Sequence, residues 1–330
     1  MSQRRATLAD LRRRIDRIDA TIQALLIRRT TVVEKVRDLK KNERVKIRPG
    51  REAEIIYRLI RRHKGPFPKL ELVRIWRELI VATLRFEGPF SVAVFAPHGH
   101  GGIWDLARDQ YGSFTPITRH DGARAVIRAV TAHRAAVGVL PLPATDEDEP
   151  WWPDLMTGRA RAWIIARLPF AGAGNARGPG ISAFAIAPVM PDPSGRDRTC
   201  LGLATDGDVG RDAIERVLAR ARLGRPDLIG VEDSQVPGGF IWLADIPGYV
   251  REDDPRLAAL KAALGDSFKR AVVLGAYAEP LGPADLAPGG LRRPNKRPGA
   301  KDAAGSLGFG AVMPSGMRSH DAPGAKGKRP

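Results

Sequence analysis

The stretch Leu8–Lys41, LADLRRRIDRIDATIQALLIRRTTVVEKVRDLKK, has an apolar pattern on which the fold of the first part of the chain depends. Its apolar residues recur at alternating steps of three and four, which predicts one side of a long helix. This apolar seam consists of Leu8, Leu11, Ile15, Ile18, Ile22, Leu25, Val32, Val36 and Leu39. Thr7 is a suitable N-cap. At ~1.5 Å per residue the helix is roughly 50 Å long, so we expect a partner chain to cover it.

Arg29 interrupts the seam at a position where an apolar residue is due. Burying a guanidinium costs free energy unless an anion pairs with it, so Arg29 is the first candidate for a binding site. Lys40 follows about three turns later and projects from nearly the same side of the helix. Arg12 lies roughly 25 Å before Arg29 on a different side. If Arg12 binds a ligand, that site lies on a partner chain; otherwise it is a surface charge.

Two further helices are predicted, one near residues 48–63 and one that carries its apolar row from residue 73 to Gly88-Pro89. Glu52 stands on the apolar side of the first, and Thr83 and Glu87 continue the apolar row of the second. One such residue is usually the end of a helix or a locally satisfied group. Together with Arg29, they indicate a polar pocket inside a helix bundle.

The rest of the chain predicts a multidomain protein. After an all-α domain at residues 1–89, short apolar runs alternate with a helical one over residues 90–195, which favours an α/β region. Residues 196–281 have the order strand, helix, strand, strand, helix, strand, which is typical of a small ferredoxin-like module. Residues 282–330 are rich in Gly, Pro, Ala and basic residues, and we expect a disordered basic tail.

The net charge of +17 is concentrated at the start of the chain, where residues 1–87 hold 24 Lys or Arg against 11 Asp or Glu. Such a domain suits nucleic acid, a membrane surface or a small polyanion, or is simply a solvated basic surface. The single Cys200 excludes an internal disulfide, and no run of about 18 apolar residues suggests a membrane span. We expect a soluble cytoplasmic protein. The scattered His residues form no metal-ligand pattern, and the Gly-rich residues 99–102 are interpreted as a surface turn.

The N-terminal pattern resembles the all-helical class of chorismate mutases over residues 8–87. The resemblance rests on Leu11-Arg12-x-x-Ile15-x-x-Ile18-Asp19, Leu25-Leu26-x-x-Arg29, Lys40, Arg51-Glu52 and Ile75-Trp76-x-x-Leu79-Ile80. It implies an intertwined homodimer with shared active sites and the conversion of chorismate, a small dianion, to prephenate. This rearrangement needs no cofactor, so catalysis comes from conformation and from fixed charges that stabilise the developing anion.

The same resemblance implies a role for each candidate residue. The substrate-binding residues are Arg12 of a partner chain, Arg51, Glu52 and Thr83, and the catalytic residues are Arg29, Lys40 and Glu87. Arg12 and Arg29 would hold the two carboxylates, because a guanidinium is bidentate and always charged, and Arg51 would reinforce the positive field. Lys40 would reach the ether oxygen and a carboxylate. Glu52 would accept a hydrogen bond from the ring hydroxyl, and Thr83 would donate one to a carboxylate.

Two positions depart from the pattern of this family. Arg48 stands where an acidic residue commonly precedes the Arg-Glu pair, so the hydroxyl contact made by that side chain is lost or replaced. Glu87 stands where many members carry Gln and some carry Glu. Only a protonated acid can donate a hydrogen bond to a developing anion, so activity is expected to fall as pH rises.

The region after Pro89 resembles prephenate dehydratase, through Val92-Ala93-Val94-Phe95-Ala96-Pro97-x-Gly99 and the stretch from Gly138 to Thr145. Pro143 and Ala144 take the places of the Glu and Asn in that family's signature. About 35 residues between Thr145 and Ile181 are too few for its second lobe, and Ser182-Ala183-Phe184 replaces a Thr-Arg-Phe signature. Dehydratase catalysis is therefore expected to be lost.

The module that follows resembles the amino-acid-sensing domain of the dehydratases, because Val273-Leu274-Gly275-Ala276-Tyr277 matches its closing strand. The segment Glu232–Pro237 matches the ligand motif only in part, so a structural or dimerising role is favoured over phenylalanine sensing.

The sequence thus predicts a chorismate mutase of phenylalanine and tyrosine biosynthesis that binds neither nucleic acid nor membrane. Two alternatives stay open: a bifunctional chorismate mutase/prephenate dehydratase, and a non-enzymatic basic helical binding protein. The spacing of Arg29, Lys40 and Glu52 favours the enzyme, since general phosphate binding tolerates basic residues almost anywhere on a surface.

Overall fold

A computed structural model of the 330-residue chain describes residues 6–39, 46–98, 101–145, 147, 149–157, 161–174, 180–207 and 209–287. These described residues belong to one compact unit. None of the helices in the described ranges has the length and apolar character needed to cross a membrane.

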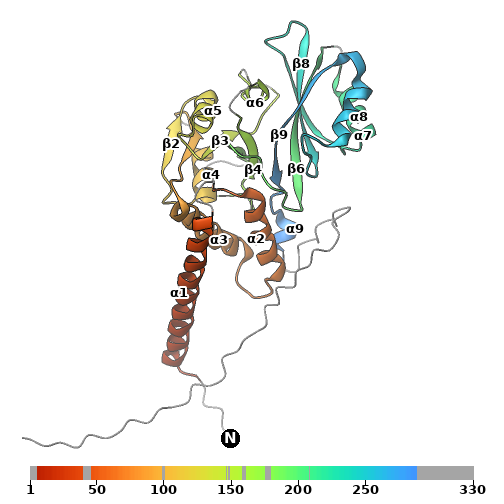
Figure 1. Ribbon diagram of the computed structural model, residues 1–330. Helices are drawn as coiled ribbons and strands as arrows, with labels where there is room; N and C mark the ends of the chain where they lie inside the picture. Colours follow the sequence, from red (N-terminus) through yellow and green to blue (C-terminus); the bar gives the residue numbers. More distant parts are fainter. Residues whose placement is uncertain are drawn as a thin grey trace, which may run out of the picture. The chain divides into compact units, whose positions relative to one another are not determined.

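The first part of the chain forms the three predicted helices, α1 (Leu8–Leu39), α2 (Pro49–Arg62) and α3 (Lys69–Glu87), drawn in Figure 1. The N-cap prediction for α1 is confirmed: the Thr7 hydroxyl accepts from the backbone N–H of Asp10 at 3.2 Å, and the Asp10 carboxylate accepts from the Thr7 N–H at 3.0 Å. Such reciprocal bonds satisfy two backbone donors that would otherwise lack partners. Pro49 opens α2, where its missing N–H costs nothing.

A nine-stranded sheet follows in the order β2-β1-β3-β5-β4-β9-β6-β8-β7. β1 runs parallel to both β2 and β3, β4 pairs parallel with β9 at a single position, and the other neighbours are antiparallel. The strands are β1 (Val92–Phe95), β2 (Ile117–His120), β3 (Val137–Pro141), β4 (Trp163–Leu168), β5 (Ala183–Ala187), β6 (Asp197–Asp206), β7 (Asp227–Glu232), β8 (Gly239–Pro247) and β9 (Phe268–Ala278).

Helices α4 (Gly102–Tyr111) and α5 (Ala123–Thr131) cover opposite faces of the parallel strands. Successive residues of a strand point to opposite faces, and accordingly Val92 packs in the α4 cluster and Ala93 in the α5 cluster. Gly138 of β3 lets α5 approach, because a Cβ there would lie 2.7 Å from Val126. The interpretation of residues 99–102 as a surface turn was wrong for its last residue, where α4 begins because its apolar side packs on the sheet.

After β5 the elements are β6, α7 (Arg211–Arg220), β7, β8, α8 (Pro255–Leu264) and β9, so the predicted order is confirmed. Shorter helices are α6 (Asp154–Thr157), η1 (Gly265–Ser267) and α9 (Pro283–Leu286). α9 lies inside the predicted tail but is held in place: Asp285 pairs with Arg196 at 3.0 Å, and its carbonyl accepts from Lys69 at 3.1 Å. Residues 288–330 lie outside the described part of the chain.

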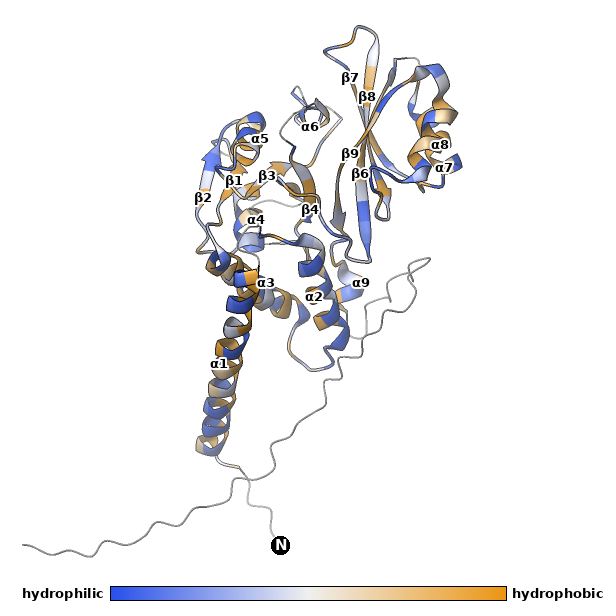
Figure 2. Cartoon of the chain, in the orientation of Figure 1, coloured by the Kyte–Doolittle hydropathy of each residue, from blue (hydrophilic) through white to orange (hydrophobic). Residues whose placement is uncertain are grey.

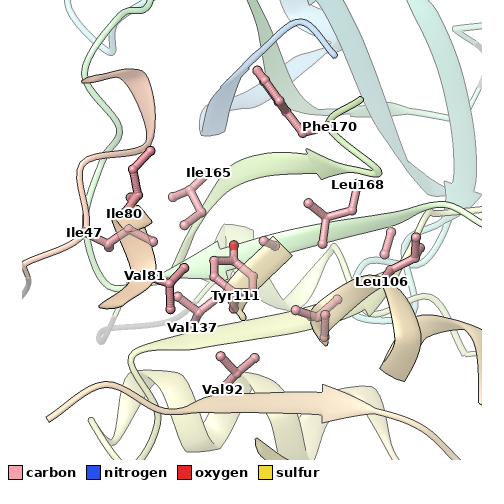
Figure 3. Close-up of a cluster of buried hydrophobic side chains, with 14 of the residues drawn as sticks. Ile47, Ile80, Val81, Val92, Leu106, Tyr111, Val137, Ile165, Leu168 and Phe170 are labelled. Carbon is pink, nitrogen blue, oxygen red and sulfur yellow. The ribbon is translucent and has the colours of Figure 1, made fainter. Parts of the chain in front are cut away.

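Two of the three N-terminal helices share a core with the α/β region. Ile56 and Ile60 of α2 and Ile80 and Val81 of α3 belong to the same buried cluster as Tyr111, together with residues of β1, β3 and β4 (Figure 3). By contrast, α1 buries no residue in the single chain, and its seam residues remain exposed; Figure 2 shows apolar residues along its length. The helical region is therefore not a self-contained bundle within one chain.

Candidate functional site

Arg29 and Thr83 come together where α1 meets α3. The Arg29 guanidinium donates to the Thr83 hydroxyl at 2.6 Å, and that hydroxyl donates to the carbonyl of Leu79 at 2.8 Å. Both side chains are half-buried. The Leu79 carbonyl orients the hydroxyl so that its lone pairs face Arg29. In this contact Arg29 supplies an always-charged donor, which suits a bound oxyanion.

Glu52 lies in a different environment, the buried cluster between α2, α3 and α4. Its carboxylate accepts from the Arg77 guanidinium at 3.1 Å, and only 7% of Glu52 and 5% of Arg77 are exposed. The Arg77 guanidinium also stacks 4.5 Å above the centre of the Phe170 ring. Burial raises the pKa of the Glu52 carboxyl, although the nearby Arg77 opposes this shift. The structure therefore pairs Glu52 with Arg77 and does not join it to Arg29.

Three atoms of this buried cluster have no hydrogen-bond partner among the described residues: Oε1 of Glu52, Nε of Arg77 and the hydroxyl of Tyr111. All three residues line a cavity of about 10 Å³, which is space for one water molecule. Burial also raises the pKa of the Tyr111 hydroxyl. The cluster is thus a polar centre inside an apolar core, and unsatisfied groups of this kind are expensive to bury.

None of the other predicted site residues within the described ranges is hydrogen-bonded to Arg29 or Thr83. Arg51 is exposed and forms an ion pair with Glu54 at 3.0 Å. Arg12 is exposed near the start of α1, and Glu87 is half-buried at the last position of α3. Lys40 lies outside the described residues. Arg48, where the family pattern has an acidic residue, lies 3.6 Å from the carboxylate of Asp192.

Arg77 is the residue that sequence reasoning missed. It lies four residues after Val73 and three before Ile80, on the apolar side of α3. The criterion that singled out Arg29, a guanidinium at an apolar helical position, also applies to Arg77.

A second crevice lies at the carboxyl ends of β1 and β3. From β1 the chain passes through α4 to β2 on one side, and from β2 it crosses back through α5 to β3 on the other side of β1. Ligands bind open α/β sheets at such switch points. The crevice has a volume of about 740 Å³, and Phe95, Gly101, Arg119, Leu142, Arg167 and Ser182 are among its lining residues. It therefore presents two guanidinium groups and the start of α4 beside apolar surface.

The segment resembling a sensor motif borders the largest of these spaces. Glu232, Asp233 and Gln235 line a cavity of about 770 Å³ beside β7 and β8, with Lys269 and Arg270 across from them. Its walls carry both signs of charge.

The sequence family described as "Chorismate mutase type II" matches residues 11–88. The bifunctional chorismate mutase/prephenate dehydratase of Aquifex aeolicus (strain VF5) is 34% identical over 145 residues, which cover 42% of this chain and 40% of that protein. The match reaches beyond the helical region, so the predicted resemblance to a mutase fused to a dehydratase-like region is confirmed. The chain spans well under half the length of this relative in the match.

Among solved structures, a protein described as GqqA, a novel type of quorum quenching acylase, aligns with 18% identity and a TM-score of 0.42, over 58% of this chain and 96% of that one. The prephenate dehydratase from Arthrobacter aurescens in complex with L-Phe aligns with 15% identity and a TM-score of 0.41, over 60% and 95%.

Proposed function

We propose that this protein is a chorismate mutase that converts chorismate to prephenate in the biosynthesis of phenylalanine and tyrosine. The observation that carries the proposal is the family match over residues 11–88, which spans α1, α2 and α3. The contact between Arg29 and Thr83 supports it, since these residues of α1 and α3 were selected from the sequence for one anion-binding pocket.

The proposed mechanism is electrostatic. Arg29, with Arg12 of a second copy, holds the two carboxylates of chorismate in a compact geometry, and Arg51 adds to the positive field. Thr83 donates to a carboxylate once its hydroxyl leaves the Leu79 carbonyl, to which it donates in the single chain. Lys40 stabilises the negative charge that develops on the ether oxygen as its bond to carbon breaks, and Glu87 is the other proposed catalytic residue. Fixed donors need no reorganisation during the reaction, which is why they accelerate it.

Glu52 fits this scheme only after a change in its surroundings. The role of accepting from the ring hydroxyl requires its carboxylate, which is 7% exposed and bonded to Arg77 at 3.1 Å in the single chain, to become accessible to a ligand. The proposal therefore includes a rearrangement of α2 relative to α3 when two copies assemble.

The assembly that we propose is a homodimer in which α1 of one copy covers α1 of the other. Its seam exposes large apolar side chains over the whole helix, including Ile15 at 56%, Ile18 at 58% and Leu25 at 57%. A contiguous apolar surface of this kind is typical of an interaction site. The proposal places the protein in the cytoplasm, without nucleic acid or membrane as a partner.

We also infer that residues 196–281 form a ferredoxin-like module. The antiparallel strand order β9-β6-β8-β7 and the positions of α7 and α8 between strands support this. The proposed domain limits remain 1–89, 90–195 and 196–281.

The test is direct: chorismate loss and prephenate formation are followed with the purified full-length chain, alongside Arg29→Ala and Arg28→Ala. Removing one transition-state donor costs about 100-fold or more in turnover, which is the expected effect of Arg29→Ala. Arg28 is its exposed neighbour and serves as the matched control, with turnover close to the unsubstituted chain. Absence of chorismate turnover would overturn the proposal and favour a non-enzymatic basic binding protein.

A second candidate is the bifunctional enzyme, and the crevice at the ends of β1 and β3 favours it. Arg119 and Arg167 could hold the carboxylates of prephenate there. Against it, Pro143 and Ala144 carry no acid–base or amide group. Formation of phenylpyruvate from added prephenate would establish this activity, and its absence would limit the chain to the mutase reaction.

A further inference from the structure

A cavity of about 250 Å³ lies between α3, α4 and the segment after β4. This is slightly below the range of drug-sized pockets, so it suits a small metabolite. Its apolar walls consist of Leu70, Val73, Leu106, Pro169, Phe170 and Ala171. None of the residues predicted from the sequence to bind chorismate lines it.

Arg77 supplies the cavity with a buried positive charge. The residue is 5% exposed, one guanidinium N–H is bonded to Glu52, and Nε has no hydrogen-bond partner among the described residues. The Phe170 ring below the guanidinium stabilises its charge but offers no acceptor. A ligand oxygen at Arg77 would supply the acceptor that the protein does not.

The remaining polar groups lie around this charge. Arg74 and Asp109 form an ion pair at 2.9 Å, with the Arg74 side chain 57% exposed and the Asp109 side chain 18% exposed. Gln110 adds a largely buried amide to the lining. Glu52 lines the adjoining 10 Å³ cavity and does not line this one. The 250 Å³ cavity therefore combines two cations, one of them already paired with Asp109, with a mainly apolar wall.

We propose that this cavity binds a small organic carboxylate with an apolar tail, the carboxylate on Arg77 and the tail against Leu70, Val73 and Leu106. A guanidinium binds carboxylate through charge-assisted hydrogen bonds, which are stronger than neutral ones. The apolar walls select against inorganic anions. Such an anion would lose its hydration shell in the cavity and has no apolar tail to pack against the walls.

A ligand bound in the cavity would affect the contacts that join α3 to α1 and α2. Arg77 holds Glu52 of α2, and Thr83, six residues further along α3, holds Arg29 of α1. A carboxylate on Nε of Arg77 shares this guanidinium with Glu52 and thereby alters the Arg77–Glu52 contact. If so, the ligand and chorismate affect each other's affinity reciprocally, a consequence that rests on the proposed function.

The experiment uses calorimetric titration of the full-length chain, without chorismate, with 3-phenylpropanoate and with its primary amide. The two probes share a tail and differ in charge. The expected result is that the carboxylate binds at least about tenfold more tightly than the amide. Because no turnover is measured, the result stands or fails independently of mutase activity.

Two pairs of variants locate the site. Ala171→Leu fills the cavity and is expected to weaken binding of 3-phenylpropanoate by about tenfold or more, whereas Ala259→Leu on the exposed side of α8 leaves it unchanged. Leu70→Asp and Leu70→Asn have the same shape at the half-open mouth of the cavity. The Asp variant is expected to bind the carboxylate roughly fivefold more weakly than the Asn variant, and both bind the amide alike.

Equal affinity of carboxylate and amide would overturn the proposal. So would the absence of binding heat at millimolar ligand, or unchanged affinity in Ala171→Leu.

Discussion

At the scale of single residues, the Glu52–Arg77 pair shows that a charged residue on an apolar helical face can serve packing as well as chemistry. Both groups are almost fully buried, and each retains an atom without a partner among the described residues. Burying two charges costs desolvation free energy that one hydrogen bond only partly offsets. The pair therefore depends on both members being present.

Arg77→Met is expected to lower the free energy of unfolding by roughly 3–5 kcal/mol, because it leaves the Glu52 carboxylate buried without its cation. The double variant Glu52→Gln with Arg77→Met removes both charges and is expected to be more stable than Arg77→Met alone. Urea unfolding of the four members of this cycle measures the coupling. Additive effects of the two substitutions would contradict a buried, mutually dependent pair.

Asp245 of β8 makes the stability of the folded chain depend on pH, and the direction of this dependence follows from its environment. It is 7% exposed, accepts from Arg198 at 2.8 Å and also accepts from the Tyr277 hydroxyl. Burial raises the pKa of Asp245, an effect that Tyr277 and Arg198 only partly oppose. The folded chain thus keeps this proton to higher pH than the unfolded chain. The contribution of Asp245 to the free energy of unfolding is therefore fully present below about pH 4. It is lost as the pH rises through the raised pKa of the folded chain.

Asp245→Asn abolishes this titration. The free energy of unfolding of the variant minus that of the unsubstituted chain is expected to increase as pH rises from about 4 to about 7. Urea unfolding at several pH values measures it, with Asp253→Asn at an exposed position as the control. A difference that stays constant with pH would contradict the assignment.

At the scale of elements, α1 depends on a partner. The helix spans 32 residues, none of them buried in the single chain, and of the helices and strands α3 is the one it contacts most. Helices in proteins are stabilised mainly by packing of their apolar face against other elements. The exposed seam of α1, with its many large aliphatic side chains, lacks such packing in the single chain, so we expect a second chain to provide it.

Ile18→Lys places a charge in the middle of the seam and is expected to shift the protein from dimer to monomer, since a buried unpaired ammonium opposes association. Gln23→Lys adds the same charge roughly on the opposite side of α1 and is the matched control. Sedimentation velocity at several protein concentrations gives the assembly state. A dimer unaffected by Ile18→Lys would show that the seam is not the interface.

At the scale of the whole molecule, the sequence predicted elements better than their packing. Helical spacing located α1, α2 and α3, and the apolar runs predicted an α/β region where β1, β3, β4 and β5 lie, because each pattern is local. A periodic row shows that a face is buried but not what buries it. The packing of α2 and α3 on the sheet, and the Arg77 partner of Glu52, depend on contacts between distant segments and were not predicted.

The sequence likewise predicted the residues of the candidate site better than the contacts between them. Arg29 and Thr83 were selected because each breaks an apolar row, and the structure joins them by a hydrogen bond. For Arg12 and Arg51 the pattern gave positions, but in the single chain neither is hydrogen-bonded to Arg29 or Thr83. Residues contributed by two chains can be brought together only by the assembly.

The central claim is a chorismate mutase whose active sites are built from two chains, and mixing two inactive variants tests it. Arg12→Ala and Arg29→Ala are each expected to lack turnover as homodimers. Co-expressed, they form mixed dimers in which one site carries both substitutions and the other carries neither. With random pairing, chorismate turnover is expected to recover to about a quarter of that of the unsubstituted protein. A co-expressed mixture no more active than the separate variants would contradict the claim.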